Sequence, residues 1–342
     1  MGLLLDVIEG KEVPYTPIWL MRQAGRYMAE YREVRSQNTF LDMCFKPEVA
    51  CEVTMQPIDI LDVDAAILFS DILPPLIPMG LDLEYVPGKG PVINNPIREE
   101  KDLNRLNFSP DMNYFQYIQE AVSMIRGKLP QEKDLIGFAG APFTMASYAI
   151  EGGGSKSYEH IKALMYREPQ TFHRLMQLIT DVTKGYLKMQ LDAGAQMVQI
   201  FDSWGGVLSR ADYLKYAHPY SCEIISWLKK EVSKPVIHFV KGAGSWFDAA
   251  SNSKADVCGV DWTLDLDLAV KACNNSKVLQ GNLDPIALFA PQDVIEEKLK
   301  LILEQAEGAK GHIFNLGHGI VPKTPVENVK FVVDKVKELS AR

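Results

Sequence analysis

The chain is poor in the residues that build redox and metal-binding frameworks. Only five of its 342 residues are cysteines and only six are histidines, and no two cysteines are spaced as Cys-x-x-Cys. A disulfide scaffold or a structural zinc site needs clustered cysteines at short, regular spacing. The scattered cysteines therefore predict reduced structural thiols, and the sequence predicts no metal site.

Long hydrophobic runs are also missing. No uncharged apolar stretch reaches the length of about 18 residues that a transmembrane helix needs. The first residues, MGLLLDVIEGKEVPYTP, carry acidic groups, lack a basic start and contain too short an apolar run for a secretory signal. We therefore expect a cytoplasmic protein that does not bind membranes.

Basic residues are outnumbered: 36 lysines and arginines face 44 aspartates and glutamates, for a formal net charge of −8. A nucleic-acid surface is marked by a basic stripe, so no nucleic-acid partner is expected. Yet the segment PIWLMRQAGRY places Arg22 and Arg26 four residues apart, directly after an apolar run. A solvated helix face would show the same spacing. Gly25 weakens that alternative, because glycine costs a surface helix about 1 kcal/mol relative to alanine and suits a close approach of ligand or backbone.

Short apolar runs recur along the chain and alternate with helical patterns such as residues 213–232 and 291–309. Strands that alternate with helices indicate parallel βαβ units. Eight such units predict a (β/α)₈ TIM barrel that forms a single domain over residues 1–342. A doubly wound open sheet is the alternative, but its Gly-x-Gly-x-x-Gly turn is missing. The runs are residues 17–21, 65–70, 135–140, 195–201, 235–240, 257–262, 278–282 and 312–317.

The chain is longer than the roughly 250 residues that a barrel needs. Much of the excess lies in residues 71–134, which begin with a stretch dense in proline and glycine. This stretch predicts an irregular excursion with a hairpin, followed by a helix near residues 111–128.

Polar residues follow nearly every predicted strand. Barrel active sites are built at the carboxyl ends of the strands, so these residues are the candidates for a site. A purely structural function remains possible for several of them. Asp71 could cap a turn before two prolines, His318 could be structural, and the glycines at 152–154 could form a flexible loop. The residues are Arg22, Gln23, Arg26, Asp71, Tyr148, Asp202, Ser203, Trp204, Lys241, Asp261, Asn282, Asp284 and His318.

Two long motifs and four short ones resemble the uroporphyrinogen decarboxylase family. The long motifs are PIWLMRQAGRYMAEYREVR and GFAGAPFTMASYAIEGGGSK, and the short ones are ILFSDIL, VDWT, LQGNLDP and NLGHGI. They occur in the family's order and span essentially the full chain. The resemblance implies an enzyme that converts the four acetate arms of uroporphyrinogen to methyl groups, giving coproporphyrinogen for tetrapyrrole (heme) synthesis. It also implies a single (β/α)₈ domain, a homodimer, and no cofactor or metal.

The resemblance also assigns site residues by motif. Asp71 matches the essential aspartate. We hypothesise that Arg22 is catalytic as well, by positioning or helping to donate a proton to the substrate. Phe40 and Arg35 fall near the family's pocket. The matched substrate-binding residues are Arg22, Gln23, Ala24, Gly25, Arg26, Asp71, Tyr148, Ser203 and His318.

Two rival functions stay open at this point. A zinc-dependent corrinoid or thiol methyltransferase of the same superfamily would carry a His-x-Cys element after a strand, but the chain has His238 followed by Val240, and its late motif NLGHG has no cysteine. A non-catalytic tetrapyrrole-binding protein would use the same pocket without turnover.

Overall fold

A curled sheet of seven parallel strands forms the centre of the molecule in the computed structural model, which describes residues 2–86 and 88–342. The strands are hydrogen-bonded in the order β1-β4-β5-β6-β7-β8-β9. Met1 and Pro87, which belong to the predicted domain of residues 1–342, lie outside the described residues. The strands are β1 (Ala65–Ile67), β4 (Asp134–Gly140), β5 (Met197–Asp202), β6 (Val236–Val240), β7 (Val257–Gly259), β8 (Val278–Leu283) and β9 (Gly311–Leu316).

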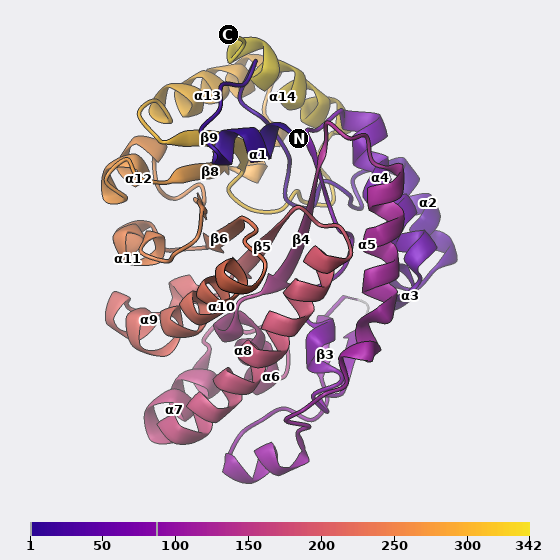
Figure 1. The fold of residues 1–342 in the computed structure, drawn as a ribbon, viewed down its shortest axis with the longest axis vertical. Helices are drawn as coiled ribbons and strands as arrows, with labels where there is room; N and C mark the ends of the chain where they lie inside the picture. The colour runs from indigo at the N-terminus through magenta and orange to yellow at the C-terminus, as the bar shows by residue number, and fades with distance from the viewer. Residues whose placement is uncertain (1, 87) are drawn as a thin grey trace.

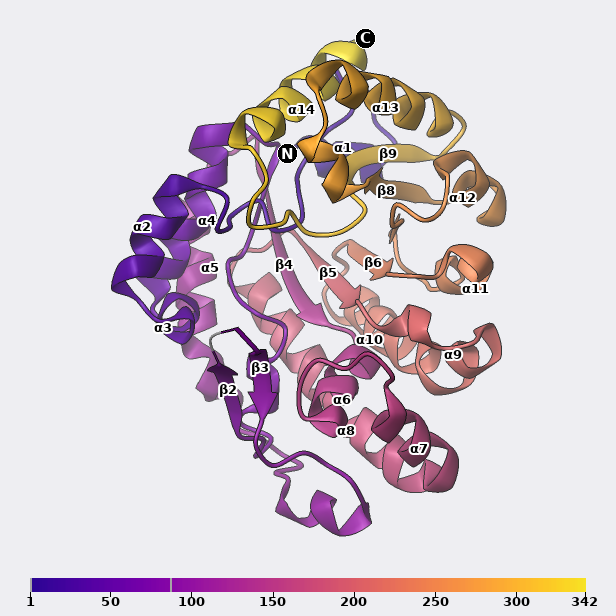
Figure 2. The same ribbon diagram turned by 180° about the vertical axis from the view of Figure 1, so that it is seen from behind.

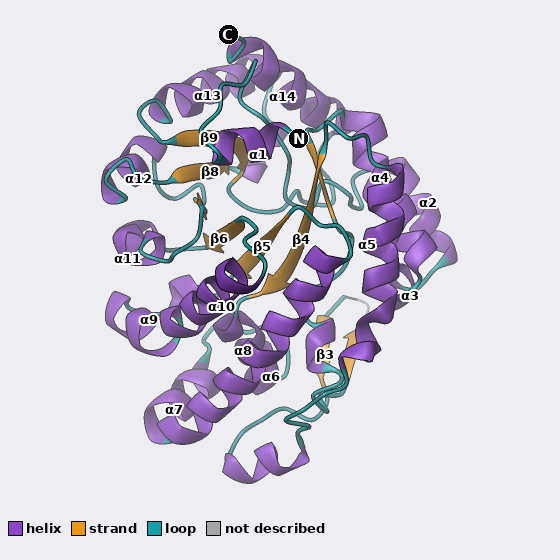
Figure 3. Cartoon of the chain, viewed as in Figure 1, coloured by secondary structure: helices purple, strands orange, loops and turns teal. Residues whose placement is uncertain are grey.

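Helices surround the outside of this sheet, as both ribbon views and the view coloured by secondary structure show (Figures 1, 2 and 3). Each strand from β4 onward is preceded by a helix, as the alternating pattern predicts. None of the described helices is both long and apolar enough to cross a membrane. The α-helices are α1 (Leu3–Ile8), α2 (Ala29–Gln37), α3 (Phe40–Phe45), α4 (Pro47–Leu61), α5 (Gln116–Lys128), α6 (Pro142–Glu151), α7 (Glu159–Arg167), α8 (Pro169–Asp192), α9 (Arg210–Tyr216), α10 (His218–Glu231), α11 (Phe247–Ser251), α12 (Leu266–Ala272), α13 (Gln292–Gln305) and α14 (Val326–Leu339).

The first predicted strand, residues 17–21, joins the sheet through a single parallel bridge between Ile18 and Phe314. On one side, the backbone N–H of Phe314 donates to the carbonyl of Pro17 at 2.8 Å. On the other side, Asp64 donates its N–H to the carbonyl of Ile18 at 2.8 Å and accepts the Ile18 N–H on its carboxylate at 2.8 Å. Residues 17–21 therefore lie between β9 and the residues just before β1, and the sheet has the form of a (β/α)₈-like barrel.

The sheet encloses a small apolar core of its own, separate from the larger core between the sheet and the helices. Helix α1 contributes Leu4 and Leu5 to this inner core and lies against β4 and β9. The carboxylate of Asp134, the first residue of β4, accepts the N–H groups of both leucines at 3.0 and 3.2 Å. Helix α1 thus covers the amino-terminal end of the curled sheet. The other members of the inner core include Ala65, Ile136, Met197, Ile237, Val257, Val278 and Ile313.

The predicted excursion between the second and third runs is confirmed. It contains the antiparallel hairpin of β2 (Leu83–Val86) and β3 (Gly90–Ile93) and ends in α5, which begins at Gln116 after a 3₁₀ turn. The excursion also contains the 3₁₀ helices Pro74–Leu76, Glu100–Arg105 and Met112–Phe115; the later loops hold Gly205–Val207, Gly244–Trp246 and Pro285–Phe289.

The helical pattern over residues 213–232 corresponds to two helices rather than one. Helix α9 ends at Tyr216 and α10 begins at His218. Pro219 lies in the first turn of α10, where its missing N–H costs no hydrogen bond, whereas the same proline inside one long helix would break an intrahelical bond. The chain therefore restarts the helix at this proline.

A glutamine completes the edge of β4. Strand β1 ends at Ile67, so the backbone of Phe138, further along β4, has no strand partner on that side. The side chain of Gln190, from α8, accepts the Phe138 N–H at 2.8 Å and donates to the Phe138 carbonyl at 3.0 Å. Gly137 leaves space for this amide, because a β-carbon there would touch the Gln190 oxygen.

We predict that Gln190→Leu lowers the free energy of unfolding by about 2–4 kcal/mol, because it leaves a buried N–H and carbonyl unpaired. Urea-induced unfolding followed by circular dichroism measures this effect. The exposed Gln170 on the same helix is the control, and Gln170→Ala is expected to change stability by less than about 0.5 kcal/mol. Equal stability of the two variants would contradict the assigned function of Gln190 as a backbone clamp.

Candidate functional site

Two adjoining cavities lie next to the segments that follow residues 17–21 and β1. An inner cavity of about 340 Å³ is lined by the chain after residues 17–21, by the chain after β1, by α6, and by the chain after β5 and β9. An outer cleft of about 1300 Å³ lies between α2, α3 and the β2–β3 hairpin. Asp71 lines both spaces. Together they are large enough for a ligand bigger than most drug-sized molecules.

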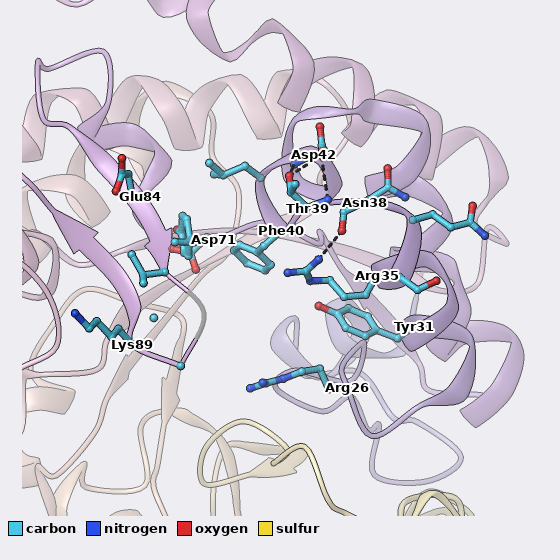
Figure 4. A pocket seen from close by; sticks show the side chains of 17 residues that line it. Arg26, Tyr31, Arg35, Asn38, Thr39, Phe40, Asp42, Asp71, Glu84 and Lys89 are labelled. Carbon is cyan, nitrogen blue, oxygen red and sulfur yellow. Dashed lines mark hydrogen bonds between the residues drawn. The ribbon is translucent and has the colours of Figure 1, made fainter.

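The outer cleft is bordered by basic and aromatic side chains. Figure 4 shows Arg26 and Arg35 extending into the space that separates α2 from the hairpin, with Phe40 and Asp71 across it. The guanidinium group of Arg35 donates one N–H to the carbonyl of Asn38, which holds the end of this side chain at the border of the cleft. Asp42 also borders the cleft, but its carboxylate is bound to the Thr39 N–H and hydroxyl in a capping box at the start of α3.

The guanidinium groups of Arg22, Arg26 and Arg35 have no acidic partner in residues 2–86 and 88–342. No carboxylate oxygen there forms an ion pair with any of the three within 4.0 Å, although other arginines of the chain form such pairs, for example Arg210 with Asp248 at 2.6 Å. All three side chains are exposed on the walls of the cavities. Such unpaired cations are suited to bind an anionic ligand.

Arg22 adopts an unusual backbone conformation. Its φ of 60° lies in the left-handed region that residues with a side chain rarely occupy. This turn directs the side chain across Gly319, in the loop after β9, where a β-carbon would overlap the Cγ and Cδ of Arg22. Gly319 is a site residue that the sequence reasoning missed, although the glycines of NLGHGI were a visible signal.

The carboxylate of Asp71 lies at the junction of the two cavities. It accepts the N–H of Leu73 at 2.9 Å, which caps the turn after β1. Burial raises the pKa of Asp71 above its usual range, while the Leu73 N–H, the Tyr85 hydroxyl and the charge of Arg22 act in the opposite direction. The capping interpretation of Asp71 is therefore confirmed, and the same carboxyl group also lines both cavities.

Tyr85, on β2, is a second residue that sequence reasoning did not single out. Its ring packs against Phe40 with centroids 4.8 Å apart, and it lines the outer cleft beside Asp71. The hydroxyl is buried and has no partner at hydrogen-bonding distance and angle within the described residues, but it lies near enough to the Asp71 carboxylate to favour its ionised form. No local pattern could identify it, because the hairpin brings it to Asp71 only in the folded chain.

Tyr148, Ser203 and His318, which the sequence predicts as substrate-binding residues, all line the inner cavity. The ring of Tyr148 lies 6.0 Å from that of Trp204, and burial raises the pKa of the Tyr148 hydroxyl. Burial, with the charges of Arg22 and Lys241, lowers the pKa of His318 to about 3. The imidazole is therefore neutral near pH 7.

The remaining motif residues have different surroundings. Gln23 and Ala24 line the inner cavity, but the buried amide of Gln23 accepts the Leu20 N–H at 3.1 Å and donates to the Ala65 carbonyl at 3.0 Å. Gly25 lies in the turn between Arg22 and Arg26 and borders neither cavity. Its hydrogen, where other residues have a side chain, faces the carbonyl of Arg22.

Behind the cavity wall, a buried carboxyl group organises the loop after β5. Asp202 accepts the hydroxyl of Thr144 at 2.8 Å, and that hydroxyl in turn accepts the Trp204 N–H at 3.1 Å. Burial raises the pKa of Asp202 to about 7. Asp202 does not line the inner cavity. Through Thr144 it holds the loop that carries Ser203 and Trp204.

Within the described residues, no three His, Cys, Asp or Glu side chains gather in a way that could hold a metal ion. His238, on which the zinc interpretation relies, is buried on β6 with both ring nitrogens unpartnered there. It borders neither cavity.

Comparison with known proteins identifies the family. The family model for uroporphyrinogen decarboxylase matches residues 1–339. The chain belongs to the uroporphyrinogen decarboxylase family. It is 50% identical over 338 residues to the uroporphyrinogen decarboxylase of Trichlorobacter lovleyi, covering 99% of this chain and 98% of that protein. It is also 50% identical over 337 residues to the enzyme of the same name from Carboxydothermus hydrogenoformans, covering 98% and 96%.

Solved structures of low identity share the fold. A methyltransferase from Methanosarcina mazei superposes with a TM-score of 0.77 at 17% identity, covering 98% of this chain and 97% of that one. A B12-independent methionine synthase from a Shewanella species gives a TM-score of 0.57 at 12% identity, covering 86% and 87%. At such identities the likeness concerns the fold alone, whereas the uroporphyrinogen decarboxylase relatives match in sequence as well.

We predict that the His318 ring stays neutral from pH 8 down to about pH 5, because protonation requires a pH near its lowered pKa of about 3. The unfolded chain takes up this proton near pH 6.5, so acidification between these values favours unfolding. NMR of protein with labelled histidine rings measures the titration. In Arg22→Met the midpoint should rise yet stay below 6.5, since burial is the largest cause. A wild-type midpoint above 6 would contradict the buried environment.

Proposed function

We propose that this chain is a uroporphyrinogen decarboxylase that releases CO₂ from each of the four acetate arms of uroporphyrinogen III and forms coproporphyrinogen III in heme and tetrapyrrole biosynthesis. The observation that carries the proposal is the carboxylate of Asp71 at the junction of two cavities whose walls present unpaired guanidinium groups. A ring of pyrrole N–H groups surrounded by carboxylates is complementary to this arrangement. The family match over residues 1–339 supports the same conclusion.

The chemistry requires a place for the electron pair that CO₂ leaves on the methylene carbon. Many enzymes use a cofactor as the electron sink. The substrate can serve instead: a proton added to the pyrrole carbon next to the acetate-bearing carbon makes the ring an electron-poor iminium. The C–C bond to the carboxylate then breaks, and its electrons enter the ring. A second proton converts the exocyclic methylene to a methyl group as the ring carbon loses the first, so each arm consumes one proton net.

Asp71 is the group that we assign to stabilise the ring cation. Its carboxylate can accept hydrogen bonds from the pyrrole N–H groups that point to the centre of the macrocycle. Fixed charge in a site that excludes water is worth several kcal/mol in the transition state, since no solvent must reorganise. The Leu73 N–H holds one of its oxygens in place before the substrate binds.

The arginines are assigned to the peripheral carboxylates. Arg22 borders the inner cavity and Arg26 and Arg35 border the outer cleft, so they reach different parts of a ligand that spans both. Each can bind a carboxylate through two parallel hydrogen bonds. Arg22, near Asp71, also positions the proton that is delivered to the ring, although guanidinium is a weak acid in water.

The other walls of the inner cavity orient the substrate. Tyr148 and Ser203 present hydroxyl groups, and neutral His318 can donate one hydrogen bond and accept another. Gln23, Ala24 and Gly25 shape the turn that carries Arg22 and Arg26. Phe40 supplies an apolar surface against one face of the macrocycle.

We further propose a single closed (β/α)₈ domain over residues 1–342. Residues 17–21, the first strand in chain order, would close the barrel as its additional strand, and the active site would lie at the carboxyl ends of the strands. The hydrogen bonds that residues 17–21 form to both neighbours support the closure. The proposed homodimer, cytoplasmic location and independence from cofactors and metals are supported by the resemblance to the family.

No structural observation favours the rival functions. The methyltransferase proposal needs zinc ligands beside the reacting groups, and His238 borders neither cavity. A binding protein without turnover differs from the enzyme in one measurable respect, the release of CO₂ from uroporphyrinogen under anaerobic conditions.

Asp71→Ala is predicted to reduce turnover by about 100-fold or more, because the ring cation loses its fixed counter-charge. Asp71→Glu is also expected to be impaired, since the extra methylene displaces the carboxylate. Anaerobic incubation with uroporphyrinogen, followed by counting carboxyl groups in the oxidised products, measures the rate. Asp192→Ala, at an exposed aspartate on α8, is the control. A near-normal rate for Asp71→Ala would remove this residue from the mechanism.

Arg26→Ala is predicted to raise KM for uroporphyrinogen by roughly tenfold, the value of one charge-assisted hydrogen bond to a carboxylate. Arg26→Lys should raise it less, because lysine keeps the charge but lacks the planar fork. Steady-state kinetics of both variants measure the difference, with the exposed Arg210→Ala as a control. A KM of the lysine variant equal to that of the wild type would argue against bidentate recognition, because the charge alone would then suffice.

A further inference from the structure

Lys241 lies against Trp204, a residue in the wall of the inner cavity. It follows β6, and its ammonium nitrogen lies 5.6 Å from the ring centre of Trp204 and 5.8 Å from that of Trp262. Trp204 lines the inner cavity, and the ring of Trp262 lies 6.5 Å from that of the cavity residue His318. The lysine is thus held between two indoles beside the cavity wall, where cation–π attraction limits its motion.

The backbone around Lys241 is fixed by its neighbours. Its N–H donates to the carbonyl of Asp202 at 3.1 Å, and its carbonyl accepts the N–H of Gly206 at 3.0 Å. The next residue, Gly242, adopts a φ of 79° and donates its N–H to the carboxylate of Asp261. The loops after β5, β6 and β7 therefore meet at this lysine and hold the base of its side chain in place.

The ammonium group is not neutralised by the chain. Other lysines form ion pairs, for example Lys184 with Glu223 at 2.5 Å, but in the part of the chain that the structure describes no carboxylate lies within 4.0 Å of Lys241. Its charge reaches the cavity, since it contributes to the lowered pKa of His318. A preorganised cation without a counter-ion, next to a ligand cavity, is suited to receive an anion from the ligand.

We propose that Lys241 is a further substrate-binding residue, whose ammonium group binds a peripheral carboxylate of the tetrapyrrole at the side of the inner cavity formed by Trp204 and His318. It lies beside the inner cavity, whereas Arg26 and Arg35 border the outer cleft. The ligand would therefore be held by charges at both ends of the joined cavities. This inference rests on the proposed function, because it assumes a substrate that carries carboxylates around its edge.

The test compares Lys241→Met, Lys241→Gln and Lys241→Arg in the full-length protein. For Lys241→Met and Lys241→Gln we expect KM for uroporphyrinogen to rise roughly tenfold, while kcat changes less than about threefold, because one carboxylate contact is lost. Lys241→Arg should keep KM within about threefold of wild type, because arginine keeps the charge. Equilibrium binding of oxidised uroporphyrin, followed by tryptophan fluorescence, should weaken by the same factor, and it reads affinity without turnover.

Lys215→Met is the matched control. The ammonium of Lys215 also lies over an aromatic ring, that of Tyr216 at 4.7 Å, but this ring lines neither cavity, whereas the Trp204 ring next to Lys241 lines the inner one. This variant should keep the KM of the wild type. Thermal unfolding identifies any variant that fails to fold. If Lys241→Met does not fold, the comparison of Lys241→Gln with Lys241→Arg tests the inference.

Three results would overturn the inference: an unchanged KM in Lys241→Met, a loss confined to kcat, or an equal rise of KM in Lys241→Arg, which would indicate a packing function of the lysine stem. Absence of CO₂ release by the wild-type protein would instead refute the proposed function. The two failures are therefore distinguishable.

Discussion

The arrangement around the two cavities depends on one carboxyl group, that of Asp71. The carboxylate of Asp71 lies on a wall shared by two cavities, and burial disfavours its ionised form. The Leu73 N–H, the Tyr85 hydroxyl and the charge of Arg22 oppose that cost. These three groups come from the turn after β1, from the hairpin and from the first motif. The charge at the centre of the site therefore depends on segments that only the complete fold brings together.

The cations around the cavities are not neutralised by the described chain. Some lysines and arginines elsewhere do pair with carboxylates, as in the contact of Lys229 with Asp256. Around the cavities, Arg22, Arg26 and Arg35 keep their guanidinium groups unpaired across the described ranges. An acidic protein can thus present a basic receptor, because at physiological ionic strength only charges within about 8 Å act strongly on a bound anion.

The sequence predicted the parts of this arrangement that follow local rules. Apolar runs identified the seven strands to within a few residues, and the carboxyl-end rule pointed to Asp71 and His318 because each follows a predicted strand. Other features had no local signal. The predicted strand at 65–70 is longer than β1, which ends at Ile67. The apolar run continues beyond the strand, where Phe69 and Ser70 line the inner cavity. Arg35 and Phe40 were found by family resemblance alone, since they lie on helices that precede β1.

The residues that sequence reasoning missed are defined by contacts between distant segments. Tyr85 reaches Asp71 because the hairpin folds back over the cleft, and no pattern in LEYVPG reports that path. Gly319 matters because the side chain of Arg22 crosses it, at a separation of almost the whole chain. Gln190 pairs with β4 because β1 is short, which depends on where another strand ends. Local periodicity describes none of these relations.

The seam between residues 17–21 and β9 has a consequence for the order in which the enzyme is made. Ile18 pairs with Phe314 of β9, and the side chain of Arg22 lies against Gly319, in the loop after β9. The motif that holds Ile18 and Arg22 is therefore synthesised long before the strand and loop that it contacts. Contacts of such long sequence separation form slowly, after shorter loops have closed. In a nascent chain that stops short of β9, Asp71 therefore lacks the neighbouring Arg22 in its folded position. The inner cavity therefore cannot take its final shape before β9 and the loop after it have been synthesised.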